Sequence, residues 1–255
     1  MRTLVVMPTY NEREALPTTL AHLREAVPDV DVLVVDDNSP DGTGDWAAGA
    51  AARDERVHVL HRAGKEGLGR AYLDGFSWAL ARGYDLVVEM DADGSHRAED
   101  LPALLAATQV RPLPDLVIGS RWVPGGSVVN WPWLRQLISK LGTGYARLAL
   151  RLGVRDATAG FRVYPARTLR RLPLAEVESQ GYCFQIDMTW RVQRAGGRVV
   201  EVPITFVERT QGRSKMSRAI AVEAITRLTR WGLEDRRRRV ALRLRRLAQA
   251  LRRRA

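Results

Sequence analysis

The chain of 255 residues has a single cysteine, Cys183, and no long hydrophobic run. One cysteine excludes an internal disulfide framework and a metal centre built from several cysteines, and it agrees with a reducing compartment. No segment approaches the roughly 18 consecutive apolar residues that a membrane-spanning helix needs. The apolar run Leu4–Met7 is too short for a signal peptide. We therefore expect a cytoplasmic chain without a membrane-spanning helix.

Acidic residues are absent from Arg236 to Ala255, and ten arginines stand there. The net charge of +11 falls to +1 for residues 1–235 without these ten charges, so the body of the chain is nearly neutral. Residues 1–233 are predicted to form one domain and 234–255 a basic tail. The apolar residues of the tail fall on one helical face: Val240, Leu244, Leu247, Ala248 and Leu251. Such a helix is typical of binding to an anionic membrane surface. A solvated tail, a nucleic-acid site and a site for a membrane partner protein are the alternatives.

The rest of the chain alternates predicted strands and helices. Strands are expected at Leu4–Met7, Val32–Val35, Val57–Leu60, Leu86–Met90 and Leu116–Gly119, and helices at Glu14–Val27, Thr43–Arg53, Gly69–Ala81 and Leu101–Thr108. The second half has expected helices at Leu134–Leu152, Gln185–Ala195 and Arg218–Leu233, and an expected strand, Val199–Val207, interrupted by Pro203. This order predicts an α/β fold whose mostly parallel sheet has helices on both faces.

Polar residues follow several of the predicted strands, at the carboxyl ends where such sheets bind ligands. Among them are Asp91 and Asp93, two positions apart after an apolar run. Residues i and i+2 of a strand point the same way, so both carboxylates could converge on one cation. Oxygen ligands beside a phosphate suit Mg²⁺ or Mn²⁺, although a solvated turn is an equal alternative for this pair alone. A nucleic-acid partner would leave these acidic residues unexplained, and we expect none.

Nine segments together carry a family resemblance. They are PTYNERE (Pro8–Glu14), VVDDNSPDGTG (Val34–Gly44), KEGLGRAY (Lys65–Tyr72), MDADGSH (Met90–His96), IGSRWVPGG (Ile118–Gly126), NWPWLRQLISK (Asn130–Lys140), DATAGFRVY (Asp156–Tyr164), GYCFQIDMTWR (Gly181–Arg191) and EVPITFVERTQGRSKMS (Glu201–Ser217). The chain thereby resembles the polyprenol (dolichol) phosphate mannose synthases, which are inverting, metal-dependent family 2 glycosyltransferases of GT-A fold.

The resemblance implies transfer of mannose from GDP-mannose to a polyprenyl monophosphate, giving polyprenyl phosphate β-mannose and GDP. The enzyme alternative is a related family 2 transferase that moves glucose or another sugar from a UDP donor. A non-enzymatic adaptor built on an inactive scaffold is a third reading, and the intact pair Asp91 and Asp93 argues against it. A polyprenyl acceptor implies a peripheral location on the cytoplasmic face of the membrane.

The same resemblance assigns site residues. The guanosine would contact Pro8, Tyr10, Glu12, Val35 and Asp37. The diphosphate and the metal, Mg²⁺ or Mn²⁺, would contact Asp91, Ala92 and Asp93, with Ser95 as a weaker metal ligand. Phosphates would contact Arg121, Arg135, Arg209 and Lys215, and Ser139 lies near the lipid phosphate. Catalysis is assigned to Asp91, Asp93 and Arg121.

Other residues of these segments have open readings. We expect Arg121 and Lys215 to be exposed, and His96 to be structural rather than catalytic. Gln185 and Asp187 either face the sugar or cap the cleft. Trp131–Leu152, with aromatic, apolar and basic residues interleaved, reads equally as a helix lying in the membrane interface and as an ordinary core helix.

Overall fold

The computed structural model describes residues 1–179, 181–208 and 225–237. Its strands are β1 (Thr3–Thr9), β2 (Asp31–Asp36), β3 (Val57–His61), β4 (Leu86–Glu89), β5 (Leu116–Ser120), β6 (Ser127–Val129), β7 (Arg162–Pro165), β8 (Val199–Pro203) and β9 (Thr205–Val207). Its helices include α1 (Leu16–Ala26), α2 (Thr43–Ala51), α3 (Leu68–Ala81), α4 (Leu101–Ala107), α5 (Trp133–Leu150), α6 (Ala166–Arg171) and α7 (Gly181–Arg194). Residues 225–237 are also helical.

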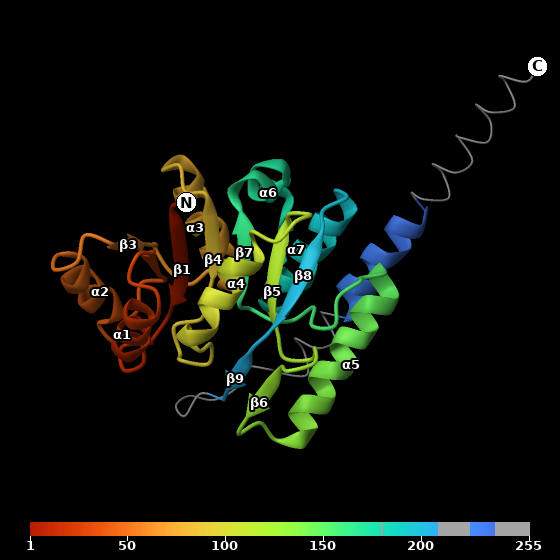
Figure 1. The fold of residues 1–255 in the computed structure, drawn as a ribbon, viewed down its shortest axis with the longest axis horizontal. Coiled ribbons are helices and arrows are strands. Elements are labelled where there is room, and N and C mark those ends of the chain that lie inside the picture. The colour runs from red at the N-terminus through yellow and green to blue at the C-terminus, as the bar shows by residue number, and fades with distance from the viewer. Residues whose placement is uncertain (180, 209–224, 238–255) are drawn as a thin grey trace, which may run out of the picture.

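The described residues form a seven-stranded sheet in the order β3-β2-β1-β4-β7-β5-β8 (Figure 1). Its strand pairs are parallel, except that β7 runs antiparallel between β4 and β5. The predicted mostly parallel α/β sheet is therefore confirmed. The sequence analysis missed β7, because it is a short strand reached directly from a loop and not through a helix.

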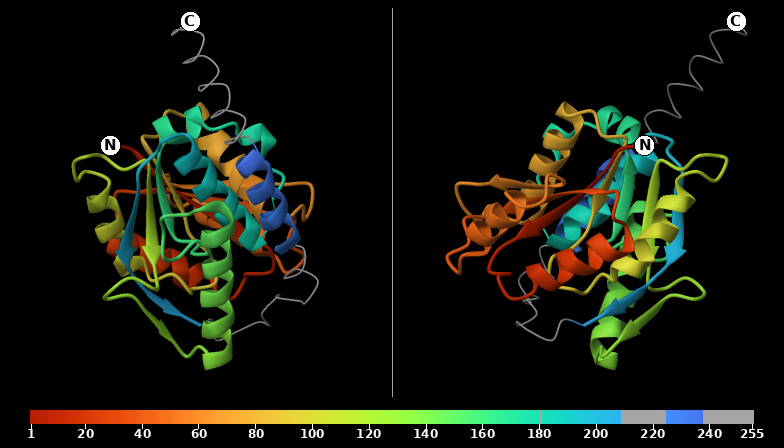
Figure 2. Two further views of the ribbon diagram at one scale, coloured as in Figure 1. Left: turned by 90° about the vertical axis from the view of Figure 1, so that its right-hand side faces the viewer. Right: turned by 60° about the vertical axis from the view of Figure 1, so that its left-hand side comes forward.

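Alternate residues of the strands serve two hydrophobic layers. Val5 of β1 faces the layer that includes residues of α1, α2 and α4. Val6, its neighbour, faces the layer that includes residues of α3, α5 and α7. Gly75 allows α3 to lie close on the sheet, since a Cβ atom there would come within 2.4 Å of a Val6 methyl. Helices therefore cover both faces, as the sequence predicts (Figure 2).

The carboxyl ends of the parallel strands lie at the lower side of Figure 1, where β6, β9 and one end of α5 extend beyond the sheet. The expected strand Val199–Val207 forms β8 and β9, because after Pro203 the chain leaves the large sheet and pairs with β6. Gly142 and Gly144 lie within α5, which is one continuous helix. These extensions build one wall of the site described next.

The helix over residues 225–237 packs against α5 and α7 (Figure 2, left). Trp231 stacks on Trp190 of α7 with ring centroids 5.9 Å apart. Gly232 approaches α5 so closely that a Cβ atom would lie 2.6 Å from the Ala149 carbonyl oxygen. The helix runs through positions 233 and 234, where the sequence analysis places the boundary between the domain and the basic tail. That domain boundary stays a prediction. Tail residues 238–255 lie outside the described residues. Within the described part of the chain, no helix is long and apolar enough to cross a membrane.

Candidate active site

A cavity of about 370 Å³ opens at the carboxyl ends of the strands. It brings together most of the residues that the sequence assigns to the site: Pro8, Tyr10, Glu12, Asp37, Asp91, Ala92, Asp93, Ser95, Arg121 and Arg135. Val35 and Ser139 do not line this cavity. Arg209 and Lys215 lie outside the described residues. One cavity thus joins the acidic pair Asp91 and Asp93, the carboxylate of Asp37 and two arginines from segments far apart in the sequence.

Asp91 and Asp93 reach the cavity from a loop, since β4 ends at Glu89. The expectation that strand alternation aligns them is therefore wrong, and a turn does so. The Ser95 backbone N–H donates a hydrogen bond to Asp93 Oδ1 at 3.0 Å. The Tyr72 hydroxyl donates to Asp91 Oδ1 at 3.4 Å, and burial raises the pKa of that hydroxyl, with Asp91 adding to the effect. Both carboxylates are held in place without a strand.

The donor set of this loop suits a hard divalent cation. The described part of the chain contains no group of three or more His, Cys, Asp or Glu side chains placed to hold a metal ion. The protein therefore offers two carboxylates and the nearby Ser95, and leaves further positions for phosphate oxygens and water. Mg²⁺ is bound in this way in sites that handle phosphorylated substrates. The residues present fit such an ion.

His96 supports the loop that carries Asp91 and also lines the cavity. Its Nδ1 accepts a hydrogen bond from the Asp91 backbone N–H at 3.0 Å, and its Nε2 lies 3.8 Å from Asp91 Oδ2. The ring stacks on Phe161 with centroids 5.0 Å apart and is almost fully buried. The geometry agrees with the expected structural role.

Asp37, after β2, is held by Arg62, which follows β3 directly. The Arg62 guanidinium also binds Asp74 of α3 at 2.7 Å and Glu66 at 2.9 Å, and its side chain is 7% exposed. Burial raises the pKa of Asp37, and the Arg62 guanidinium offsets part of that effect. Val35 points into the core, so only its backbone can contact a ligand. The sequence analysis missed Arg62, although its place after a strand could have marked it.

Lys65 forms another part of the same wall. Its Nζ lies 3.9 Å from the centre of the Tyr10 ring, a cation–π contact. Both side chains line the cavity, together with Pro8 and Glu12. A positive charge therefore stands beside the aromatic residue that the sequence assigns to the nucleoside.

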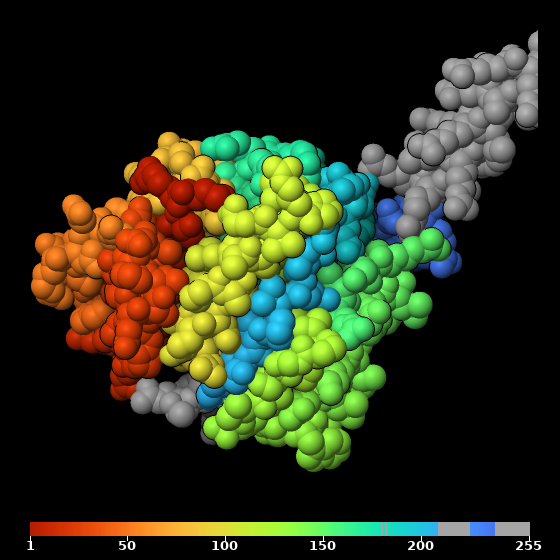
Figure 3. Space-filling view, in the orientation of Figure 1, coloured from red at the N-terminus to blue at the C-terminus, as the bar shows by residue number. Residues whose placement is uncertain are grey.

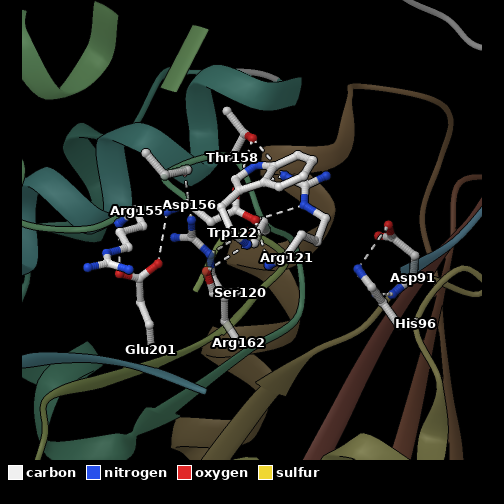
Figure 4. Close-up of polar contacts among 12 residues, drawn as sticks. Asp91, His96, Ser120, Arg121, Trp122, Arg155, Asp156, Thr158, Arg162 and Glu201 are labelled. Atoms are coloured by element: carbon white, nitrogen blue, oxygen red, sulfur yellow. Dashed lines mark hydrogen bonds and ion pairs between the residues drawn. The ribbon is translucent and has the colours of Figure 1, made fainter. Parts of the chain in front are cut away.

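Arg121 is buried, and the expectation that it is exposed is wrong. Its side chain is 5% exposed, and that of Asp156 is fully buried. Nε and Nη2 donate to the two Asp156 oxygens at 2.7 Å each, and Nη2 also donates to Thr158 Oγ1 at 2.9 Å (Figure 4). Asp156 is fixed in turn by its backbone N–H, which donates to Glu201 Oε1 at 2.8 Å. This chain of contacts sets the guanidinium rigidly at the cavity wall.

Aromatic rings surround the same guanidinium. Its central carbon lies 5.2 Å from the Trp131 ring centre and 5.5 Å from those of Trp122 and Phe206. Arg135 of α5 pairs with Glu208 and lies 4.6 Å from the Trp131 ring centre. Two arginines therefore line the cavity on the side of α5 and the β6–β9 ribbon. Ser139 lies about one turn farther along α5, half-buried.

Beneath the cavity lies a buried polar cluster of Glu89, Arg162, Tyr164 and Gln185. Burial raises the pKa of the Glu89 carboxyl to about 7, against the lowering effect of the Arg162 guanidinium. Gln185 lines the cavity. Asp187 instead accepts hydrogen bonds from Ser179 and Arg191 at 2.9 and 2.8 Å. Gln185 therefore faces the cavity, whereas Asp187 holds neighbouring residues in place.

The fold and the acidic strand-end loop define a GT-A glycosyltransferase architecture. The family model "Glycosyl transferase family 2" matches residues 4–172, and the chain belongs to that family. It is 61% identical to an undecaprenyl-phosphate mannosyltransferase of Micrococcus luteus over 92% of this chain and 96% of the relative. It is 54% identical to a polyprenol monophosphomannose synthase of Mycolicibacterium smegmatis over 92% of this chain and 88% of the relative.

Two solved structures share the fold at 19% identity. The glucosyl-3-phosphoglycerate synthase of Mycobacterium tuberculosis with Mn²⁺, UDP and its product aligns with a TM-score of 0.66 over 92% of this chain and 79% of that one. The mannosyltransferase PcManGT of Pyrobaculum calidifontis with GDP-Man and Mn²⁺ aligns with a TM-score of 0.56 over 84% and 58%. At this identity the likeness establishes the fold alone.

Proposed function

We propose that the chain transfers mannose from GDP-mannose to a polyprenyl monophosphate with inversion, giving polyprenyl phosphate β-mannose and GDP. One observation carries the proposal: a single cavity joins the pair Asp91 and Asp93 to Arg121 and Arg135. Such a cavity suits a reaction in which a metal-bound diphosphate and a second phosphate meet. The 61% and 54% identity to polyprenyl phosphate mannosyltransferases over 92% of the chain supports the choice of sugar and acceptor.

The donor occupies the side of the cavity at β1, β2 and β4. Asp37 accepts hydrogen bonds from the guanosine, and Pro8, Tyr10 and Glu12 contact it with the backbone of Val35. The diphosphate lies at Asp91, Ala92 and Asp93. The two aspartates, with Ser95 nearby, would hold Mg²⁺ or Mn²⁺, and that ion would supply positive charge to stabilise the GDP leaving group.

The acceptor phosphate lies on the other side of the cavity, at Arg121 and Arg135. Because Nε and Nη2 of Arg121 are bound to Asp156 and Thr158, Arg121 presents Nη1 and its charge to a ligand. Because the guanidinium is buried, water screens it less, and its attraction to a phosphate is stronger. Arg209, Lys215 and Ser139 complete the phosphate contacts in this proposal.

The nucleophile is an oxygen of the acceptor phosphate. A phosphomonoester has a second pKa of about 6, so it is largely dianionic at neutral pH and needs no strong general base. The chain's task is to hold two anions close together and in line, which positioned arginines achieve. Attack on the anomeric carbon from the face opposite GDP inverts the configuration there.

A membrane-facing surface on α5 fits a polyprenyl acceptor. Trp133 is 74% exposed and Leu141 is 64% exposed, and large apolar residues between them are exposed as well: Leu134, Leu137 and Ile138. An ordinary core helix would bury these residues, so that alternative is wrong for this part of α5. In Figure 3 the β6 and α5 segments form a continuous lobe at the lower edge of the molecule. We place this lobe at the membrane surface, near the acceptor phosphate side of the cavity.

Nucleotide binding separates this proposal from a UDP-sugar transferase. Calorimetry with GDP and UDP, each with Mg²⁺ or Mn²⁺, should give at least tenfold tighter binding of GDP. Chelation of the metal should weaken the binding of either nucleotide. Tighter binding of UDP would overturn the assigned donor, and equal binding with and without metal would overturn the role of Asp91 and Asp93.

A further inference from the structure

Gln185 is a buried polar side chain that lines the cavity, and its amide lies beside the Glu89 carboxyl group. It lies in the second turn of α7 and is 3% exposed. Its amide oxygen has no hydrogen-bond partner among the described residues. Buried polar groups in native proteins are nearly always hydrogen-bonded, so an unpaired amide oxygen beside a cavity indicates a ligand.

Glu89 lies behind this amide. It is fully buried at the end of β4, and its carboxyl group interacts with the Gln185 amide and the Tyr164 hydroxyl. Arg162 lies next to it, but the Arg162 guanidinium donates to the carbonyl oxygens of Ala157, Ala159 and Gln185 and to hydroxyl oxygens. Glu89 is therefore placed to hold the Gln185 amide nitrogen, which leaves the amide oxygen for a ligand.

The location favours a neutral, hydroxyl-bearing ligand. Gln185 shares the cavity with Asp91 and Asp93, and with Arg121 and Arg135. A hydroxyl group can donate a hydrogen bond to the unpaired amide oxygen, which a phosphate dianion cannot do because it carries no proton.

We propose that Gln185 binds a hydroxyl group of the transferred hexose and that Glu89 orients the Gln185 amide. Gln185 is then a specificity-determining residue and Glu89 a positioning residue. This inference rests on the proposed function, because the hexose is the part of the donor that lies between its diphosphate and the acceptor phosphate. A site built to hydrogen-bond one hydroxyl rejects substrates that lack it, because its own buried groups are then left unpaired.

The test compares Gln185→Met with Gln193→Met, which makes the same change on the same helix. Gln193 accepts a hydrogen bond from the Gly153 backbone N–H and does not line the cavity. Gln185→Met should lower kcat/KM for GDP-mannose at least tenfold and leave the Kd of GDP, which has no sugar, within twofold. Gln193→Met should leave both unchanged. Glu89→Gln should also reduce kcat/KM for GDP-mannose without weakening the binding of GDP.

Donor analogues that each lack one hydroxyl identify the contact. In the wild type one analogue should react at least tenfold less efficiently than GDP-mannose, and in Gln185→Met that ratio should approach one. The wild-type series needs no variant, so the proposal stays testable if Gln185→Met does not fold: no loss with any analogue would overturn it. If Gln185→Met weakens the binding of GDP and of GDP-mannose equally, the amide contacts the nucleotide or the diphosphate. If it changes only the KM of the acceptor, the amide contacts the acceptor. Either result would overturn the proposal. Absence of mannosyl transfer by the wild type would instead refute the proposed function.

Discussion

The guanidinium of Arg121 and the carboxylate of Asp156 form a two-point salt bridge in the wall of the cavity, with side chains 5% and 0% exposed. A residue assigned to catalysis is thus also part of the folded core. The two roles have to be measured separately, because an unfolded variant is also inactive.

We expect Arg121→Ala to lower the free energy of unfolding by about 3–5 kcal/mol, because it leaves the Asp156 carboxylate buried and unpaired. Arg155→Ala is the matched control: Arg155 is adjacent to Asp156 and exposed, and its loss should change stability by no more than about 0.5 kcal/mol. Denaturant unfolding of both variants provides the measurement. Equal free energies of unfolding for Arg121→Ala and Arg155→Ala would show that the Arg121–Asp156 salt bridge does not stabilise the fold.

Asp91→Ala or Asp93→Ala should abolish turnover and leave the fold intact, because both side chains lie at the cavity on a loop outside the sheet. Each variant should also lose the metal-dependent part of GDP binding. Asp45→Ala, at an exposed carboxylate of α2, serves as the control. Turnover within a few fold of the wild type in a metal-dependent assay would refute the metal assignment.

Arg62→Gln should weaken GDP binding about tenfold, which corresponds to about 1.4 kcal/mol. The reason is that Arg62 holds Asp37, Glu66 and Asp74 together, and Asp37 loses its orientation without it. Arg56→Gln removes a salt bridge with the exposed Asp29 and should leave GDP binding unchanged. Calorimetry with GDP decides, and identical Kd values for the two variants would assign Arg62 to stability alone.

The strand-end rule accounts for most of what the sequence could predict. It predicts Asp91 and Asp93 at one edge of the sheet, because parallel strands place their carboxyl ends together, whereas Asp37 and Arg121 are assigned by the family resemblance. It could not predict the burial of Arg121, since its partner Asp156 is 35 positions away and arginine is usually exposed. The Asp37–Arg62 pair, whose residues are 25 positions apart, could not be predicted for the same reason. Pairing across a sheet depends on tertiary contacts that local pattern does not contain.

Leu134→Ser with Leu141→Ser should reduce binding to vesicles that contain anionic lipid, because both side chains are exposed on α5 and gain from burial in the interface. Their removal should change stability little. Val110→Ser replaces an exposed apolar residue distant in sequence from α5 and should bind vesicles as the wild type does. Co-sedimentation that shows no difference between the two variants would remove α5 from the membrane surface.

Deletion of residues 238–255 should spare chemistry and weaken association with anionic vesicles. The cut belongs after residue 237, because the helix over 225–237 packs on α5 and α7 and its Asp235 is 8% exposed. Arginines near an anionic leaflet each gain roughly 1 kcal/mol, and salt screens that gain. Added salt should therefore bring full-length binding close to that of the shortened chain. Equal sedimentation of both forms at low salt would contradict a role of the tail as an anchor.

The most direct test of the central claim is a transfer assay with purified chain, a short polyprenyl phosphate and Mg²⁺ or Mn²⁺, with GDP-mannose and UDP-glucose supplied in parallel. The account predicts a lipid-extractable product from GDP-mannose only, abolished by chelation or by Asp93→Ala, with NMR showing a β-linked mannosyl phosphate. A product from UDP-glucose in place of GDP-mannose, or an α-linked product, would contradict it.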